Sequence, residues 1–286
     1  MPTPFHISSP SDPRLGDYNH LTDAQLRGAQ SRGEHMHFIA EGEGVVRRLI
    51  ESHFPIRSIL ATPHLAEKMA DALSLVPAST PLYLVDTAMM EGITGFPFHR
   101  GVLASGARLP DLPLADLLAT STALVIAENL SNVDNIGAVF RNTACMLGHT
   151  AAIFLTAECC YPLFRKPLRV SMGHALHIPF TSLPNWPLEH QQIKAAGFTT
   201  IALTPRDDAL DIRSGPLRTI KKPAFLIGAE GPGLIDQTIT DADLAVKIPM
   251  LDGADSLNVA TALAIAVSHW QPLAPGLPNG HFQSSI

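Results

Sequence analysis

Three short stretches of the chain combine glycine with polar residues in patterns that could hold a ligand or stabilise a charge. The first, ENLSNVDNIGAVFRNTACMLG, spans residues 128–148 and contains Asn135, Gly137 and Arg141. Gly137 and Arg141 are four residues apart, so in a helix they share one face, and helical side chains lean toward the helix N-terminus. The guanidinium of Arg141 is therefore expected over Gly137 and beside Asn135, where it could stabilise negative charge on an oxygen atom. The spacing alone is equally compatible with a surface arginine near a helix cap.

The second stretch, FLIGAEGPGL, is an apolar strand that runs directly into a glycine-rich loop at residues 225–234. Gly228, Gly231 and Gly233 allow the backbone to approach a flat ligand closely and to adopt positive φ angles. Glu230 is the acidic residue among them. The order GxxGxG differs from the GxGxxG order of a dinucleotide fingerprint, and no clearly periodic helix follows at once. Taken alone, this loop is a weak signal of a ligand site.

The third stretch, IPMLDGADSLNVATALAIA, covers residues 248–266 and leads into an apolar helix. Ser256 is predicted to cap the N-terminus of that helix. Asn258 lies two residues further on, and capping by Ser256 leaves its side chain unexplained. A neutral hydrogen-bonding side chain at the mouth of an apolar helix costs free energy unless it has a partner. Asn258 therefore needs a partner elsewhere in the fold.

The first stretch lies inside a predicted strand–helix–strand unit. ALVIA and AAIFL are buried-strand runs on either side of a helix expected at residues 135–147. Asp134 or Asn135 is the expected N-cap of this helix, and Gly148 is the expected residue after its C-terminus. In such units the crevice beyond the carboxyl end of the strand is where ligands bind.

Further strands and helices alternate after this unit. HIPFTSL, FTTIALT, PAFLIGAEG and LAVKIPM are predicted strands, and PLEHQQIKAAG and SLNVATALAIAVSHW are predicted helices. This alternation predicts an α/β fold with a mostly parallel sheet that is covered on both faces. The last helix is apolar almost all round, so it is expected to be deeply buried.

The N-terminal part alternates in the same way and forms a small α/β module. MHFIAEG, IRSILAT, PLYLVD and RGVLASG are predicted strands, and PHLAEKMADAL and EGVVRRLIESH are predicted helices, the latter with Val45, Val46, Leu49 and Ile50 on one face. The predicted organisation is an extension at 1–25, this module at 26–106, a linker at 107–122, the second α/β domain at 123–271 and a flexible tail at 272–286.

Composition narrows the class of protein. The 286 residues are 46% hydrophobic and 16% charged, which is typical of a globular protein with one large core or two modest ones. No apolar run reaches the roughly 18 residues that a membrane span needs, and the N-terminus lacks the charged and apolar regions of a signal peptide. The three cysteines form neither a disulfide framework nor a metal-ligand spacing, which favours a reducing cytoplasm.

The net charge and the spacing of the histidines give no positive evidence for nucleic-acid or metal binding. A net charge of −6 does not favour nucleic acid, so any RNA contact must come from local basic patches such as Arg165, Lys166 and Arg169. The loosely spaced pairs His35/His37 and His174/His177 are far more typical of core or surface residues than of metal ligands. No metal is therefore expected.

Together, the three stretches resemble in order and spacing the three motifs of the SPOUT superfamily, in its SpoU/TrmH branch of RNA ribose 2′-O-methyltransferases. The matching positions are Asn135, Gly137 and Arg141, then Gly228, Glu230, Gly231 and Gly233, then Ile248, Pro249, Ser256, Leu257, Asn258 and Val259. RVSMGHALHIPF (169–180) is similar to the linking segment of the family. The resemblance covers about 123–270, and the N-terminal module more loosely resembles an L30e-like substrate-binding domain. The final helix continues VATALAIAV where the family commonly has Val-Ser, and the acidic net charge leaves the RNA-binding surface open.

The resemblance implies a C-terminal SPOUT domain with a deep trefoil knot, a bound S-adenosylmethionine and a homodimer. Connection rules argue against a knot by default, so the knot rests on the resemblance alone. The implied reaction transfers a methyl group to a ribose 2′-hydroxyl of rRNA or tRNA. It needs accurate positioning and no metal.

The resemblance also implies roles for single residues. Arginine is a poor base at neutral pH, so Arg141 is expected as a cation that stabilises the developing alkoxide, with an RNA phosphate nearby. The other catalytic candidates are expected to brace Arg141 and the ribose: Asn135, Glu230, Ser256 and Asn258. The cofactor-binding candidates are expected around the adenosine: Gly228, Gly231, Gly233, Ile248 and Leu257.

Other functions stay open at this point. A dinucleotide-dependent oxidoreductase would use the GAEGPG loop with Asp252 downstream, although its glycine order is wrong. A catalytically silent RNA-binding relative is disfavoured by the presence of Arg141. A ribosomal-protein-like binder would rest on the N-terminal module alone.

Overall fold

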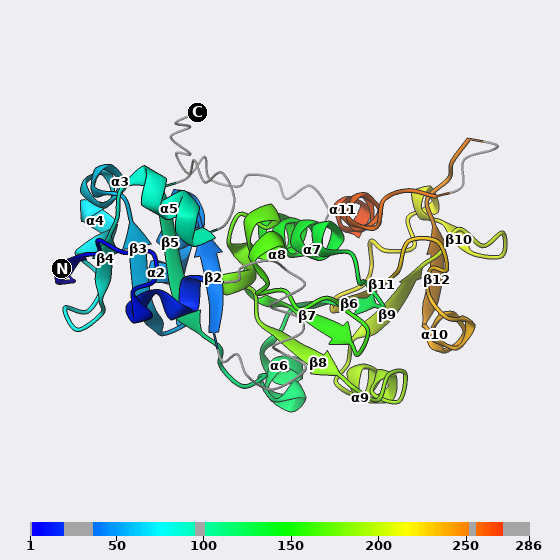
Figure 1. Cartoon of the computed structure of the whole chain (residues 1–286). Coiled ribbons are helices and arrows are strands. Elements are labelled where there is room, and N and C mark those ends of the chain that lie inside the picture. Colours follow the sequence, from blue (N-terminus) through cyan, green and yellow to red (C-terminus); the bar gives the residue numbers. More distant parts are fainter. Residues whose placement is uncertain (1, 20–36, 95–100, 252–255, 271–286) are drawn as a thin grey trace.

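The computed structural model describes residues 2–19, 37–94, 101–251 and 256–270, which build two sheets (Figure 1). The smaller sheet has the strand order β1-β4-β3-β5-β2, and the larger sheet has the order β10-β12-β9-β11-β6-β7-β8. We call the part around the smaller sheet the N-terminal unit and the part around the larger sheet the C-terminal unit.

In the N-terminal unit, β5 runs antiparallel to its neighbours β2 and β3, whereas β4 pairs in parallel with β1 and β3. Its strands are β1 (Pro4–His6), β2 (His37–Glu41), β3 (Ile56–Ala61), β4 (Leu82–Leu84) and β5 (Val102–Ala107). Its helices are η1 (Pro13–Tyr18), α2 (Glu43–Glu51), α3 (Pro63–Lys68), α4 (Ala70–Leu73) and α5 (Thr87–Thr94).

The first residues of the chain are part of this unit, contrary to the expected extension. β1 pairs with β4, and Leu15 and Tyr18 of η1 are fully buried. The hydroxyl of Tyr18 lies 2.8 Å from the Ser58 hydroxyl oxygen. The Pro- and Ser-rich composition did not predict this role, because a 3₁₀ helix of only six residues places the two large side chains in the core.

The predicted amphipathic face of α2 is confirmed, with Val45, Val46 and Leu49 buried. The single helix predicted at 63–73 is wrong in one respect. It is interrupted at Met69, whose backbone (φ −99°, ψ 15°) ends α3 and starts α4.

Every strand pair in the larger sheet is parallel. Its strands are β6 (Ala123–Glu128), β7 (Ala151–Thr156), β8 (Phe180–Leu183), β9 (Thr199–Leu203), β10 (Leu210–Asp211), β11 (Pro223–Gly228) and β12 (Leu244–Lys247). Its helices are α6 (Leu114–Thr120), α7 (Val133–Met146), α8 (Arg165–Val170), η2 (His174–Leu176), α9 (His190–Ala195), η3 (Ile212–Ser214), α10 (Asp236–Asp241) and α11 (Val259–Trp270).

Helices cover both faces of this parallel sheet, as the alternation predicts. α7, α8 and α11 lie over one face, and α6, α9 and α10 lie over the other (Figure 1). Successive strand side chains point to opposite faces. Val125 and Ala127 of β6 accordingly join the cluster with α7 and α11, whereas Leu124 and Ile126 join the cluster with α6.

The segment expected as a linker contributes to that second cluster. α6 lies within 107–122, and its Leu117 and Leu118 are buried against the sheet. Residues 108–113 alone connect β5 to α6. The paired prolines suggested a linker, but Pro113 directly precedes the helix, where its fixed φ suits a helix start.

The ends of α7 agree only partly with the sequence prediction. The N-cap is Asn132, whose side-chain oxygen accepts from the backbone N–H groups of Asp134 (2.8 Å) and Asn135 (3.4 Å), so neither predicted candidate caps the helix. The C-terminal prediction is confirmed. Gly148 follows the helix with φ +79°, and its N–H donates to the Thr143 carbonyl.

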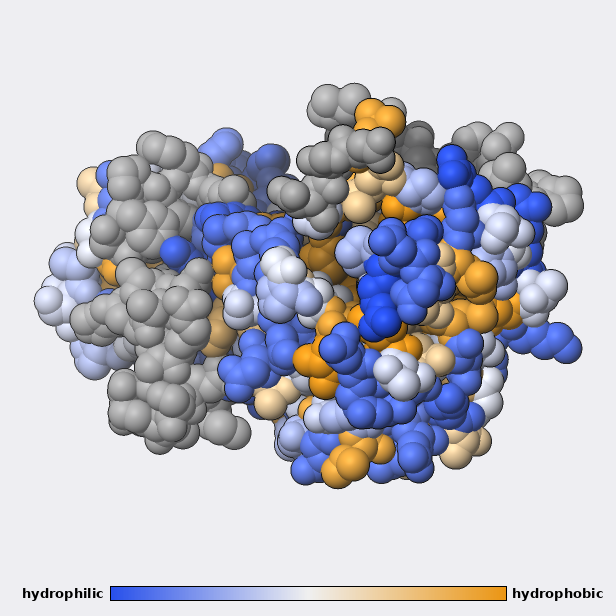
Figure 2. All heavy atoms as spheres, turned by 90° about the vertical axis from the view of Figure 1, so that its right-hand side faces the viewer, coloured by the Kyte–Doolittle hydropathy of each residue, from blue (hydrophilic) through white to orange (hydrophobic). Residues whose placement is uncertain are grey.

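α11 is less buried than its composition suggests. One face is buried by Val259, Leu263 and Val267, whereas Thr261 and Ser268 are exposed. Figure 2 looks at the end of the molecule that carries α11 and β12, and apolar residues gather toward the middle of that face. The apolar side chains of α11 therefore extend beyond the face of the helix that is buried in this chain.

The two units are in direct contact through β2 and α2 on one side and α8 and η2 on the other. The buried Glu41 carboxylate lies 3.6 Å from an Arg165 nitrogen and 3.4 Å from an Arg169 nitrogen. Arg48 donates to the carbonyl of Met172, and one apolar cluster runs through both units. The N-terminal unit is thus packed against the C-terminal unit rather than merely tethered to it.

Candidate functional site

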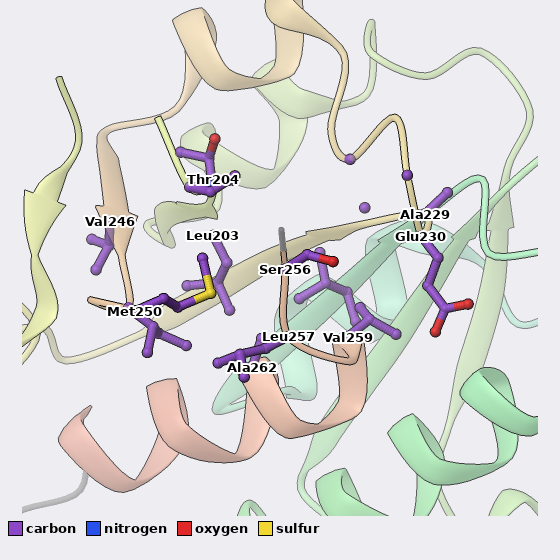
Figure 3. A pocket seen from close by; sticks show the side chains of 16 residues that line it. Leu203, Thr204, Ala229, Glu230, Val246, Met250, Ser256, Leu257, Val259 and Ala262 are labelled. Atoms are coloured by element: carbon purple, nitrogen blue, oxygen red, sulfur yellow. The ribbon is translucent and has the colours of Figure 1, made fainter. Parts of the chain in front are cut away.

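A cavity of about 230 Å³ lies at the carboxyl ends of β9, β11 and β12, beside the N-terminus of α11 (Figure 3). Its walls are mostly apolar side chains, namely Leu203, Ile227, Val246, Ile248, Met250 and Val259. The loop after β11 forms another wall. Figure 3 shows Glu230 apart from Met250 and Leu257, with the Ser256 side chain between them. The cavity therefore combines apolar walls with a polar rim.

The loop at residues 228–234 requires glycine at its glycine positions for two different structural reasons. A Cβ on Gly228 would lie 2.2 Å from the backbone carbon of Gly233, so the loop can close only over a glycine. Gly231 and Gly233 have φ angles of +90° and +70°, as their positions predict. The Gly233 N–H donates to the Ala229 carbonyl at 3.0 Å and closes the turn.

Asn258 joins the three sequence stretches. Its Nδ2 donates to Oδ1 of Asn135 at 2.8 Å and to Oε1 of Glu230 at 3.3 Å. Its Oδ1 accepts from the backbone N–H groups of Ala260 (3.0 Å) and Thr261 (3.3 Å). The predicted cap Ser256 is thus wrong, because the helix begins at Val259 and Asn258 is the residue in position to cap it.

All five cofactor-binding candidates line the cavity: Gly228, Gly231, Gly233, Ile248 and Leu257. Of the catalytic candidates, Glu230 and Ser256 also line it, whereas Asn135 and Asn258 lie behind the rim through their hydrogen bonds. Asn135 is 4% exposed, and its Nδ2 has no hydrogen-bond partner among the described residues.

Arg141 does not join this group within one chain. Its side chain is exposed, and it makes no hydrogen bond or ion pair with any residue that the structure describes. The expected bracing of Arg141 by the other catalytic candidates is therefore not formed. Six helical positions separate Asn135 from Arg141, so their side chains point about 120° apart around the helix axis.

Gly137 has a different role from the one expected. A Cβ there would lie 2.6 Å from Cβ of Val170 and 2.9 Å from the Pro167 carbonyl oxygen. Gly137 therefore permits close packing of α7 on α8, rather than a free path for Arg141. Along the same face, Arg141 lies near η2, where its charge helps to lower the pKa of His174.

That pKa falls to about 4, chiefly because His174 is partly buried. The charges of Arg48, His149, His177 and Arg141 lower it further. The ring of His149 meets that of His177 edge-on at 5.9 Å. His174 and His177 thus belong to a crowded, cation-rich junction between α2, α7 and η2, and the predicted partner of His37, His35, lies outside the described residues.

Sequence reasoning missed Glu128, the last residue of β6. It is 1% exposed and accepts three hydrogen bonds from loops and helices near the cavity. A signal was present, since a carboxylate that ends an otherwise apolar strand must find partners when the strand is buried.

Among residues with a described position, no group of three or more His, Cys, Asp or Glu could hold a metal ion. No helix in the same part of the chain is long and apolar enough to cross a membrane. No disulfide bond joins the three cysteines, all of which lie among the described residues. Asp252, which the oxidoreductase alternative needs, lies outside the described residues.

Comparison with known proteins gives a consistent result. The model of the SpoU rRNA Methylase family matches residues 122–268, which include all three stretches. The uncharacterised tRNA/rRNA methyltransferase Rv0881 of Mycobacterium tuberculosis is 37% identical over 261 residues, or 91% of this chain and 89% of the relative. The 23S rRNA (guanosine-2′-O-)-methyltransferase RlmB of Acinetobacter baylyi is 30% identical over 184 residues, or 62% of this chain and 73% of RlmB.

The fold is similar to that of a solved methyltransferase. The crystal structure of an AdoMet-bound rRNA methyltransferase from Sinorhizobium meliloti superposes with a TM-score of 0.74 at 23% identity, covering 93% of this chain and 97% of the other. The similarity extends over both units, so their shared arrangement belongs to a known fold.

Proposed function

The chain belongs to the SpoU rRNA methylase family of RNA methyltransferases, and from that premise we propose that it methylates the 2′-hydroxyl of a ribose in ribosomal or transfer RNA in the cytoplasm. The observation that carries the proposal is the hydrogen-bonded chain Asn135–Asn258–Glu230 beside the cavity. The name of the RlmB relative, a guanosine-2′-O-methyltransferase, supports a ribose target.

The cavity fits S-adenosylmethionine, the molecule that the Sinorhizobium relative binds. Apolar walls suit the flat faces of adenine, and the glycine loop exposes backbone groups that can bond its edges. No atom lies within 4 Å of where a Cβ on Gly231 or Gly233 would stand, so glycine keeps this side of the cavity open. When bound, the cofactor supplies a methyl group on a positively charged sulfur atom.

The chain's own residues would hold the ribose and stabilise charge. Glu230 and Ser256 line the cavity and would bond ribose hydroxyls, and Asn258 donates a hydrogen bond to Glu230. The guanidinium of Arg141 would stabilise the alkoxide that forms as the 2′-hydroxyl loses its proton, because an arginine stays charged at neutral pH.

In a homodimer, a second copy of the chain would cover the exposed part of α11, and Arg141 would act at a site shared with that copy. The exposed large apolar side chains of the C-terminal unit include Leu210, Ile235, Leu251 and Leu257. Exposed apolar groups at one end of a molecule favour a partner. We therefore include a homodimer in the proposal.

The proposal also covers the finer fold assignments. The N-terminal unit would be an L30e-like domain that reads the RNA, with the C-terminal SPOUT domain performing the transfer. A deep trefoil knot would involve the segment after β11. In support of it, β11 lies between β9 and β6, and α11 packs back onto β11 and β9.

Calorimetry and methyl transfer test the proposed function. We expect heat of binding with S-adenosylmethionine and none with NAD. Total rRNA and tRNA would then be incubated with methyl-labelled cofactor, digested to nucleosides and analysed by mass spectrometry. A 2′-O-methylated nucleoside supports the proposal. Label on a base refutes the ribose target, and binding without transfer to either RNA favours a silent relative.

A further inference from the structure

Glu128 stands next to the glycine loop through the register of the sheet. β6 and β11 pair so that Glu128 lies opposite Gly228, the first residue of the loop. The five residues that precede Glu128 in β6 are apolar, and the side chain itself is 1% exposed. A carboxylate in such a position is costly unless several donors surround it.

Three donors from three different segments meet this carboxylate. Its Oε1 accepts from the backbone N–H of Ile235 at 2.6 Å. Its Oε2 accepts from Nε1 of Trp186 at 2.6 Å and from the hydroxyl of Thr238 at 2.5 Å. Short hydrogen bonds to a carboxylate are among the stronger ones in proteins.

These bonds fix the far end of the cavity wall. The loop is held at its tip by the bond between Glu230 and Asn258, and at its exit by the bond between Ile235 and Glu128. Thr238 ties the first turns of α10 to the same carboxylate, and Trp186 is itself stacked on His190 with ring centroids 5.2 Å apart. Glu128 therefore ties the exit of the loop to the end of β6.

We propose that Glu128 is a positioning residue for the cofactor cavity, acting by holding the loop at 228–235 against the end of β6. The inference rests on the proposed function, since it assigns that cavity to S-adenosylmethionine. A carboxylate is required because it only accepts hydrogen bonds. A glutamine would turn an N–H₂ group toward at least one of the three donors.

The test compares Glu128→Gln with a matched variant, Glu189→Gln. Glu189 is also buried and accepts from the Asn185 N–H at 2.9 Å, but no bond joins it to the loop. We expect Glu128→Gln to speed amide hydrogen exchange at residues 229–235 at least tenfold and to weaken S-adenosylmethionine binding about tenfold. Glu189→Gln should leave both unchanged, even where both variants lower the melting temperature.

Thr238→Val provides a milder variant should Glu128→Gln fail to fold. It removes one donor and keeps the side-chain shape, so exchange at residues 229–235 should rise about threefold. Unchanged exchange in the folded variants would overturn the proposal. If the wild-type protein bound no S-adenosylmethionine, the proposed function would fail. Amide hydrogen exchange at residues 229–235 would still test whether Glu128 positions the loop.

Discussion

At the scale of single residues, Asn258 performs two tasks that the sequence assigns to different residues. Its oxygen caps α11, and its nitrogen holds Asn135 and Glu230. An asparagine is suited to both because its amide carries an acceptor and a donor. The fold and the candidate site therefore depend on the same side chain.

Asn258→Asp separates these two tasks. A carboxylate still caps the helix but has no donor for the Asn135 oxygen, and it places negative charge beside Glu230. We expect methyl transfer to fall at least tenfold and the free energy of unfolding to fall by about 1–2 kcal/mol. Urea unfolding with single-turnover kinetics measures both. Ser256→Ala should leave stability within about 0.5 kcal/mol, because Ser256 is not the cap; a loss equal to that of Asn258→Asp would contradict our assignment.

The proposed role of Arg141 depends on what it meets outside its own chain. Arg141→Ala should reduce methyl transfer about a hundredfold or more and change cofactor affinity less than twofold, because charge on the ribose oxygen appears only in the transition state. Arg141→Lys should restore little, since an ammonium lacks the planar fork. Single-turnover methylation and cofactor titration are the measurements. A fully active Arg141→Ala protein would mean that this arginine is only a surface residue.

At the scale of elements, the contact between α7 and α8 depends on one missing side chain. Gly137 lies against Val170 and Pro167 with no room for a Cβ. The glycine of the first motif is thus explained by helix packing.

Gly137→Ala should therefore separate the two helices. A methyl group at 2.6 Å from Cβ of Val170 requires a backbone shift, which we expect to cost about 1–3 kcal/mol of unfolding free energy. Gly92→Ala in α5 is the matched control, since nothing lies within 4 Å of its Cβ position. It should be neutral or stabilising by up to about 1 kcal/mol. Thermal unfolding of both variants measures this difference in stability. Equal melting temperatures would refute the packing argument.

At the scale of the whole molecule, the junction of the two units carries the basic side chains around His174. Arg48 comes from α2 of the N-terminal unit, whereas Arg141, His149 and His177 come from the C-terminal unit. Partial burial and these charges hold the pKa of His174 near 4, below its usual 6.5. The junction is therefore sensitive to acid.

The unfolded chain takes up this proton first as the pH falls. Stability from neutral His174 is complete above pH 6.5 and is lost between 6.5 and 4. Because the side chain is only partly buried, solvent screening limits the loss to about 1 kcal/mol. We expect His174→Gln to flatten the decline of unfolding free energy between pH 7 and 4.5 by about that amount. An unchanged slope in urea titrations would show that His174 does not titrate in this way.

The sequence by itself determined the local features of this protein. The apolar strands β6 and β7, the amphipathic face of α2, the glycine after α7 and the positive φ of Gly231 and Gly233 could all be predicted. Each follows from the conformational preferences and spacing of neighbouring residues, which are visible in a short window. The candidates that line the cavity are identified instead through the resemblance of the three motifs, and of these Gly228 ends a strand.

Tertiary structure alone decided which distant side chains meet. Asn258 and Asn135 are separated by 123 positions, and Glu128 and Ile235 by 107, so no local pattern could pair them. Tyr18 and Ser58, whose hydroxyl groups lie 2.8 Å apart, are likewise separated by 40 positions. These outcomes follow from packing and from the need of each buried polar group for a partner, which only the folded chain can supply.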